Sequence, residues 1–271
     1  MWWRLWRENP NKDFVITRFE EQSGDGFFLD LRATTGKSAG KQAFVFVHGF
    51  NVPFEAAVYR TAQLAYDLDF DGAPILYSWP SEGKLTGYPT DLNNNEWTVD
   101  HLSTFLRQVS EQSGAQTIHL IAHSMGNRAL VNALAQLAAS PAATQPHFNQ
   151  VVLTAPDIDA SIFKTLAVRF QPLVARATLY ASSKDEALVA SKTYQGYQRA
   201  GDTDPAVVIV PGMDTIDVSS VDSNLIGHFY YGDNVSVISD LKRVLEGVAA
   251  PMRATLQSVN AGSASYWMFK R

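Results

Sequence analysis

Apolar residues in the middle of the chain gather in short unbroken runs that alternate with longer amphipathic stretches. The runs are rich in β-branched and aromatic side chains, as expected of parallel strands buried on both faces. They are AFVFVHG (43–49), APILYSW (73–79), TIHLIAHS (117–124), QVVLTAPD (150–157), ATLYASSKD (177–185) and TIDVSS (215–220). The amphipathic stretches repeat apolar residues about every 3.6 positions. They predict helices over Phe54–Leu68, about Glu96–Val109, Met125–Leu137, Ile162–Phe170, Asp185–Tyr194 and Val235–Leu245.

Strands that alternate with helices predict right-handed βαβ crossovers and a mostly parallel sheet with helices on both faces. Ahead of them, DFVITRF and GFFLDLRA flank EEQSGD, in which Gly24 and Asp25 suit a turn. Residues 13–33 are therefore expected to form an N-terminal antiparallel hairpin, which raises the expected strand count to eight. The sequence thus predicts an α/β fold.

The length of the chain fits one domain. At 271 residues it suits a single large α/β domain, 1–271, and it contains no internal repeat or low-complexity tract. Two irregular stretches, 80–95 and 195–214, lie between expected elements on the side where strands end, the edge at which open α/β sheets bind ligands. They are candidates for pocket walls or a small lid, and ordinary surface loops fit them equally well.

Composition narrows the expected partners. The formal net charge of -5, with 18% charged residues, gives no basic stripe for nucleic acid, so a small molecule is the expected partner. The absence of cysteine excludes disulfides, thiolate metal sites and cysteine nucleophiles. No apolar run approaches the roughly 18 residues that a membrane span needs. The start, MWWRLWRENP, lacks the apolar region of a signal peptide, so a soluble protein is expected, either cytoplasmic or exported with a leader already removed.

Three tryptophans lie close together at the start of the chain: Trp2, Trp3 and Trp6. We favour packing over the domain's own apolar surface, because large aromatic side chains usually contribute to stability in this way. Contact with a membrane surface is the alternative.

The stretch TIHLIAHSMGNRAL (117–130) places Ser124 between a strand-like run and a helix-like run. This is the context of a nucleophile elbow, whose usual pattern is G-x-S-x-G. The outer positions must be small because strand and helix approach closely there. Gly126 satisfies one side, and Ala122 adds only a methyl group at the other. We therefore predict that Ser124 is a catalytic nucleophile.

A serine nucleophile needs a base, and on this kind of fold the chain order is serine, acid, histidine. Of the six histidines, only His228, after the last expected strand, lies beyond a suitable acid. Two aspartates directly follow strands between Ser124 and His228: Asp185 and, one strand earlier, Asp157. We favour Asp185, because Asp157 begins DIDASIF and is expected to cap that helix, and we keep Asp157 as the alternative acid.

An oxyanion hole needs two backbone N–H groups aimed at the reacting carbonyl oxygen. The N–H of Met125, directly after the nucleophile, is one expected donor, and the loop VFVHGFN supplies the other through Phe50. Gly49 permits an unusual backbone there, and Asn51 is expected to brace the loop. His48 is expected to hold this loop by hydrogen bonding rather than to act as a second base.

The motifs FVFVHGFN, YSWPSEG, AHSMGNRAL, TAPDID, YASSKDEAL, DVS and GHFYY occur in this order. Together they resemble a bacterial α/β-hydrolase family of unknown function, whose members are generally regarded as serine esterases. The resemblance runs from about Ala43 to Gly247. It implies an α/β-hydrolase fold with its catalytic core at about 43–247 and, by matching positions, a triad of Ser124, Asp185 and His228. It implies no particular substrate.

The function predicted is cofactor-free hydrolysis of carboxylic esters through an acyl-enzyme, with the short loops favouring short or medium acyl chains. No H-E-x-x-H or similar ligand set is present, so no catalytic metal is expected. Two alternatives remain open. One is an acyltransferase or amidase that uses the same triad, and the other is a binding protein that has lost catalysis.

Overall fold

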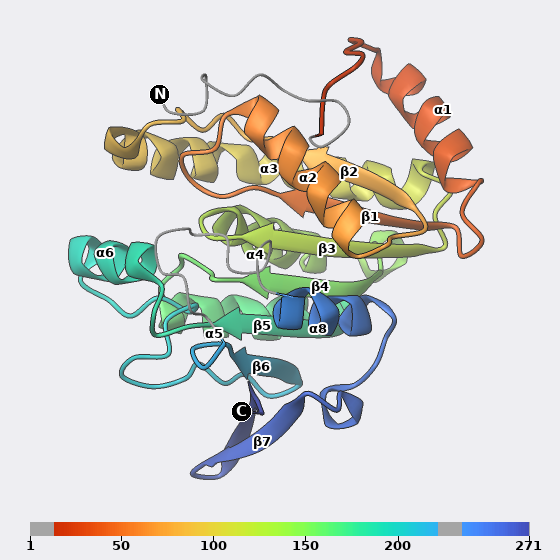
Figure 1. The fold of residues 1–271 in the computed structure, drawn as a ribbon. Coiled ribbons are helices and arrows are strands. Elements are labelled where there is room, and N and C mark those ends of the chain that lie inside the picture. The colour runs from red at the N-terminus through yellow and green to blue at the C-terminus, as the bar shows by residue number, and fades with distance from the viewer. Residues whose placement is uncertain (1–13, 222–234, 271) are drawn as a thin grey trace.

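One central sheet organises the chain in the computed structural model, which describes residues 14–221 and 235–270 (Figure 1). In this part of the chain eight strands follow the order β2-β1-β3-β4-β5-β6-β8-β7. The six strands from β1 to β6 pair in parallel, β8 joins β6 in parallel, and β7 pairs antiparallel with β8. Their bounds are β1 Gln42–Val47, β2 Ala73–Tyr77, β3 Thr117–His123, β4 Phe148–Thr154, β5 Val174–Ala181, β6 Met213–Asp217, β7 Leu256–Ala261 and β8 Ala264–Phe269.

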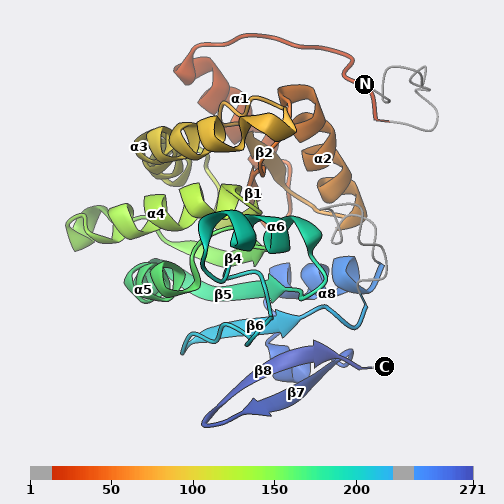
Figure 2. The same cartoon turned by 90° about the vertical axis from the view of Figure 1, so that its left-hand side faces the viewer.

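Helices cover both faces of the sheet (Figures 1 and 2). One face carries α1, α3, α4 and α5, and the other carries α2 and α8. Helix α6 lies beyond the carboxyl ends of the strands. The helices are α1 Gly24–Thr35, α2 Phe54–Asp67, α3 Tyr88–Gln112, α4 Gly126–Ala138, α5 Ala160–Phe170, α6 Glu186–Gln195 and α8 Val235–Leu245.

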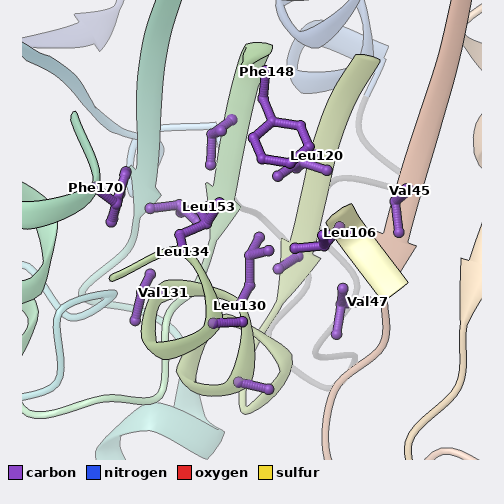
Figure 3. Packing of buried hydrophobic residues seen from close by; sticks show 14 of the residues in the cluster. Val45, Val47, Leu106, Leu120, Leu130, Val131, Leu134, Phe148, Leu153 and Phe170 are labelled. Carbon is purple, nitrogen blue, oxygen red and sulfur yellow. The ribbon is translucent and has the colours of Figure 1, made fainter. Parts of the chain in front are cut away.

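The unbroken apolar runs of the sequence result from this double cover. In β1, Val45 and Val47 pack in the core that faces α3 and α4, part of which Figure 3 shows. Phe44 and Phe46 point to the opposite core, under α2 and α8. Because side chains of a strand alternate between faces, a strand with two covered faces has no polar positions to alternate with. The six strands and six helices expected from the sequence are all present.

The N-terminal antiparallel hairpin expected over residues 13–33 was wrong. Residues 14–23 have no regular secondary structure, and Gly24–Thr35 is helix α1. Ser23 caps this helix by accepting a hydrogen bond from the Gly26 N–H, so the residues taken for a turn form the first helical turn. The buried side chains Phe28, Leu31 and Thr35 follow a helical period. The antiparallel pair of the sheet is instead β7 and β8, at the other end of the chain.

The first irregular stretch is shorter than expected, because α3 begins at Tyr88 rather than near Glu96. The first turns of α3 carry buried polar residues, and the sequence of this segment therefore resembles that of a loop. Asp91 is fully buried and accepts hydrogen bonds from the Ser81 hydroxyl and the Glu82 N–H. The polar face of the helix thus binds the preceding loop instead of water.

The second irregular stretch, 195–214, is attached to the domain by backbone hydrogen bonds. The Ala200 N–H donates to Ile158 O at 2.8 Å, and the Gly201 N–H donates to Pro156 O at 3.0 Å. Val208 is buried in the core. These contacts attach the stretch to the segment between β4 and α5.

Candidate active site

Ser124 lies in the turn between β3 and α4, at the carboxyl edge of the sheet. Its backbone has a φ of +51°, a left-handed conformation that non-glycine residues rarely adopt. The Ser124 N–H donates to Thr154 O on the neighbouring strand at 3.0 Å. Strained conformations of this kind concentrate at functional sites, because only a surrounding structure with many contacts can hold them.

The close approach of strand and helix explains the small residues around Ser124. A Cβ atom added to Gly126 would lie 2.3 Å from His48 O, closer than real Cβ atoms come to other atoms. A Cβ atom on Gly49 would lie 3.0 Å from the Ser124 Cβ. Ala122 is fully buried, and its methyl group packs in the core on the side of the sheet covered by α3 and α4. The departure from glycine at position 122 is therefore compatible with the turn.

Two asparagines that sequence reasoning missed support the turn from behind. The Asn127 Nδ2 donates to Ser124 O at 3.1 Å and to Thr154 O at 2.9 Å. The Asn95 Nδ2, on α3, donates to Met125 O at 3.1 Å. Only the position of Asn127, directly after the five-residue motif, hinted at such a role, because the partners of both side chains come from distant parts of the sequence.

The expected oxyanion-hole residues lie on the two sides of Ser124. Met125 is buried and directly precedes α4, and Phe50 lies in the loop after β1, which contacts Ser124 at Gly49. Among the bonds of the described residues, neither the Met125 N–H nor the Phe50 N–H has a protein acceptor. Asn51 takes a positive φ of 58° in the same loop.

His48 anchors this loop. Its Nδ1 lies 2.9 Å from Gly49 O, its Nε2 lies 3.2 Å from the Ser78 hydroxyl, and its ring stacks on Trp79. The Trp79 Nε1 in turn donates to His48 O at 2.7 Å. Burial lowers the pKa of His48, although its backbone hydrogen bonds oppose that effect. A neutral ring with these contacts matches the expected role of holding the loop.

Asp157 does not cap the helix that follows it, and that expectation was wrong. The cap of α5 is Asp159, whose Oδ1 accepts from the N–H groups of Ser161 and Ile162. Asp157 is buried and accepts from the Ser191 hydroxyl at 2.5 Å through Oδ1 and from the Tyr88 hydroxyl at 2.8 Å through Oδ2.

Asp157 also contacts the nucleophile turn, because its N–H donates to Ser124 O at 3.2 Å. Burial and the Asp157 carboxylate raise the pKa of Tyr88 to about 12. The Tyr88 hydroxyl therefore stays protonated at neutral pH and keeps donating its hydrogen bond.

Asp185 follows β5 and caps α6. Both cap hydrogen bonds, from the N–H groups of Ala187 and Leu188, go to its Oδ1 at 3.1 Å. The Asp185 side chain is buried close to the carboxyl edge of the sheet. His228, the expected base, lies outside the described residues.

A cavity of about 460 Å³ opens beside Ser124. Most of its lining is apolar, and it combines residues of the loop after β1, the start of α3 and α6. The lining residues are Phe50, Leu85, Tyr88, Pro89, Ser124, Asp157, Ala187, Ala190, Ser191 and Tyr194. The structure therefore brings Ser124, Phe50 and Asp157 to one cavity, with Met125 behind Ser124.

Two kinds of feature are absent from residues 14–221 and 235–270. None of their helices combines the length and apolar character that crossing a membrane requires. Their histidines and carboxylates form no group of three or more that suits a metal ion.

Comparison with known proteins supports the fold seen here. A protein-family model described as alpha/beta hydrolase of unknown function (DUF900) matches residues 28–246. The uncharacterized protein alr1448 of Nostoc sp. PCC 7120 is 26% identical over 126 residues, which are 37% of this chain and 33% of that protein. The chain thus spans about one third of this relative.

Two solved structures resemble the chain at low sequence identity. Lipase B of Aspergillus fumigatus is 14% identical with a TM-score of 0.52, over 80% of this chain and 56% of the lipase. An uncharacterized protein of Bacillus cereus is 12% identical with a TM-score of 0.46, over 89% of this chain and 66% of that protein. At such identities the likeness to the lipase concerns the fold alone. Since the family model covers most of the chain, this protein belongs to the α/β hydrolases of unknown function.

Proposed function

We propose that this α/β hydrolase cleaves carboxylic esters of short or medium acyl chain with Ser124 as its nucleophile. The observation that carries the proposal is the strained turn at Ser124, on the wall of a mostly apolar cavity. A serine held in this conformation projects from the end of a strand toward substrate, which a structural serine does not require.

In the proposed reaction, the Ser124 Oγ attacks the ester carbonyl carbon while His228 takes the hydroxyl proton. His228 then gives this proton to the leaving alcohol oxygen as the C–O bond breaks, which leaves an acyl-enzyme on Ser124. A water molecule attacks the acyl-enzyme in the same way and releases the carboxylic acid. His228 is neutral at the start and at the end of each half-reaction. Neither half-reaction uses a cofactor.

Charge develops on the carbonyl oxygen in both half-reactions, and the Met125 and Phe50 N–H groups are the proposed donors to it. Their lack of a protein acceptor in the described part of the chain supports this role. Asp185 is the proposed partner of the imidazole, and it would hold the tautomer that leaves the other ring nitrogen free to accept the Ser124 proton. Its position after β5, one strand beyond Asp157, supports the choice, and both Asp157 oxygens already accept hydroxyl donors.

Hydrolysis of p-nitrophenyl esters from acetate to palmitate tests the proposal. We expect Ser124→Ala to lower kcat by at least about 1,000-fold, because the nucleophile is removed. Ser161→Ala, at an exposed serine of α5, is the matched control and should keep the wild-type rate. A phosphonate probe should label Ser124 in the wild-type protein, as read by peptide mass spectrometry.

Equal rates in wild type and Ser124→Ala would overturn the proposal. So would an inactive wild-type protein that the phosphonate probe does not label, and this result would favour a binding protein. Ester formation or aminolysis with added alcohols or amines would instead identify an acyltransferase or amidase.

A further inference from the structure

Helix α6 forms one wall of the cavity beside Ser124. Four of its side chains line that cavity: Ala187, Ala190, Ser191 and Tyr194. Their spacing of three, four and seven residues places them on one face of the helix. Phe50, Leu85, Tyr88 and Pro89 also line the cavity, and the Tyr88 hydroxyl reaches α6, 2.9 Å from the Ser191 hydroxyl.

Two of the four side chains of α6 that line the cavity, Ala187 and Ala190, end in a methyl group. Ala187 is half-buried, and Ala190 is exposed at the rim. The Tyr88 ring also lines the cavity and makes edge-on contacts with Phe50, at 5.2 Å between ring centroids, and with Tyr194 of α6, at 5.7 Å. A chain lying in the cavity would therefore contact these aromatic rings and the two methyl groups.

The polar groups of the cavity bind one another. The Asp157 carboxylate accepts from both Ser191 and Tyr88, and the Gln195 Nε2 donates to the Tyr88 hydroxyl at 2.6 Å. Behind Asp157, the buried Arg199 Nη1 lies 4.0 Å from its Oδ1 and compensates its charge. An additional ligand would have to compete with these bonds, so the cavity offers mainly apolar surface.

Asp157 is also the only charged side chain that lines the described cavity. Among the described residues the cavity wall carries no cation, so a carboxylate on the substrate would find no opposite charge there. The exposed apolar side chains Leu85 and Tyr194 continue the apolar surface to the rim. These features together favour an uncharged, apolar group.

We propose that this cavity receives the uncharged apolar chain of the ester and that Ala187 and Ala190 set the length it accepts. The inference rests on the proposed function and adds to it the chemical class of the substrate group and the side chains that select it. Larger side chains at these two positions would fill the channel while leaving Ser124 and its neighbours untouched.

Ala190→Leu and Ala187→Leu test this inference, with Val189→Leu on the same helix as the matched control. Val189 is exposed and is not a lining residue of the cavity. The substrates are p-nitrophenyl esters of increasing acyl length and acetate esters of alcohols of increasing length. In Ala187→Leu and Ala190→Leu we expect kcat/KM for the long members of one series to fall at least tenfold. Apolar pockets discriminate between substrates that differ by a single methylene group by about that factor.

Acetate hydrolysis should fall less than hydrolysis of the long members in both Ala187→Leu and Ala190→Leu, and Val189→Leu should keep the wild-type profile. A shift in the acyl series assigns the cavity to the acyl chain, and a shift in the alcohol series assigns it to the alcohol; both support the inference. Unchanged profiles in both series, with Ser124-dependent hydrolysis intact, would overturn it and leave the proposed function standing.

A binding measurement makes the test independent of catalysis. Nile red, an uncharged apolar dye, should bind the Ser124→Ala protein with increased fluorescence, and adding Ala190→Leu should raise its Kd at least threefold. Adding Val189→Leu should leave the Kd unchanged. If Ala190→Leu leaves dye binding unchanged as well, the cavity is not the apolar site, whether or not the protein hydrolyses esters.

Discussion

At the scale of single residues, the turn at Ser124 shows how strain is held in place. The Ser124 N–H binds Thr154 O, and its carbonyl oxygen accepts from the Asn127 backbone N–H, the Asn127 side chain and the Asp157 N–H. A left-handed conformation costs a non-glycine residue about 1–2 kcal/mol. These bonds offset that cost and leave the hydroxyl to project from the end of the strand.

The roles of the two aspartates can be separated by amide substitutions. We expect Asp185→Asn to lower kcat by roughly 1,000-fold or more, because an amide no longer orients and stabilises the imidazolium. Asn caps helices as well as Asp, so the free energy of unfolding should change by less than about 0.5 kcal/mol. Steady-state kinetics with p-nitrophenyl butyrate and urea unfolding measure the two effects.

Asp157→Asn should show the opposite pattern. It leaves the buried Arg199 without its counter-charge and should lower the free energy of unfolding by roughly 3 kcal/mol, while kcat per folded molecule stays within tenfold. Asp159→Asn, at the cap of α5, is the control for both variants. If Asp157→Asn loses more activity per folded molecule than Asp185→Asn, Asp157 is the catalytic acid.

The limits of prediction at this scale follow from where the partners of a residue lie. Ser124, Ala122 and Gly126 were predictable because the motif that contains them is local, at the junction of one strand and the next helix. The backbone that leaves no room for a side chain at Gly126 belongs to Val47 and His48, which are distant in sequence. The supporting hydrogen bonds could not be predicted from the sequence. Asn127 donates to Thr154 O and Asn95 donates to Met125 O, and each donor meets its acceptor only in the folded chain. Asp157 was expected to cap the helix that begins at DIDASIF, but the structure shows that Asp159, two residues later, is the cap.

At the scale of elements, periodicity succeeded where a segment was covered on both faces and failed where it was partly exposed. The six strands β1 to β6 were each recognised as a continuous apolar run. In α1 the apolar residues at 27, 28, 29 and 31 fit both a strand and a helix, and exposed Leu29 completed a false alternation. The start of α3 was missed because its buried Asp91 and Asn95 bind loops rather than apolar side chains.

Strand β3 contains a buried histidine that should make stability depend on pH. His119 is fully buried, with its Nε2 3.2 Å from the Gln42 Oε1, and burial lowers its pKa from 6.5 to about 4. Between these values the unfolded chain binds a proton that the folded chain does not, so stability falls as the pH drops from 6.5 to 4. The full loss by pH 4 is about 3 kcal/mol.

Urea unfolding of wild type and His119→Gln over this pH range measures the effect. Carboxylates also titrate near pH 4, so the relevant quantity is the difference between the two proteins at each pH. Wild type should lose stability relative to His119→Gln as the pH falls, and the difference should be constant above about pH 7. Parallel stability curves would show that His119 does not take up this proton on unfolding.

At the scale of the whole molecule, the C-terminal hairpin completes the sheet. β8 pairs with β6 only through Ile216 with Trp267 and Asp217 with Met268. So short a ladder needs further attachment, and the segment before β7 provides it through Arg253. The Arg253 Nη1 lies 2.7 Å from the Asp240 Oδ2 of α8.

The attachment of Arg253 is a buried ionic cluster. Asp240 also accepts the Tyr180 hydroxyl of β5 at 2.6 Å, and Arg253 lies 3.6 Å from Asp214 of β6. Burial raises the pKa of Asp240, and the Arg253 charge opposes that rise. The cluster therefore joins four separate parts of the chain, including the helix that directly follows residues 222–234. The sequence predicted no element after the helix Val235–Leu245. The β7–β8 hairpin and these contacts were therefore not predicted.

Removal of Arg253 should destabilise the whole domain in a pH-dependent way. Arg253→Met keeps the volume but leaves the Asp240 carboxylate buried without a cation, which should cost roughly 3–5 kcal/mol at pH 8. Without Arg253 the pKa of Asp240 rises further, so the folded protein takes up a proton as the pH falls toward 5 and the destabilisation shrinks. Urea unfolding at both pH values measures this trend.

Two further variants decide whether the ion pair is the cause. Arg243→Met removes an exposed arginine of α8, paired with Glu246, and should cost less than about 1 kcal/mol at either pH. Asp240→Asn combined with Arg253→Met removes the unpaired charge, so it should recover stability relative to Arg253→Met and lose the pH dependence. If Arg253→Met lowers the free energy of unfolding as little as Arg243→Met does, the cluster does not attach the hairpin. The short β6–β8 ladder and its apolar contacts would then be sufficient to hold the hairpin on the sheet.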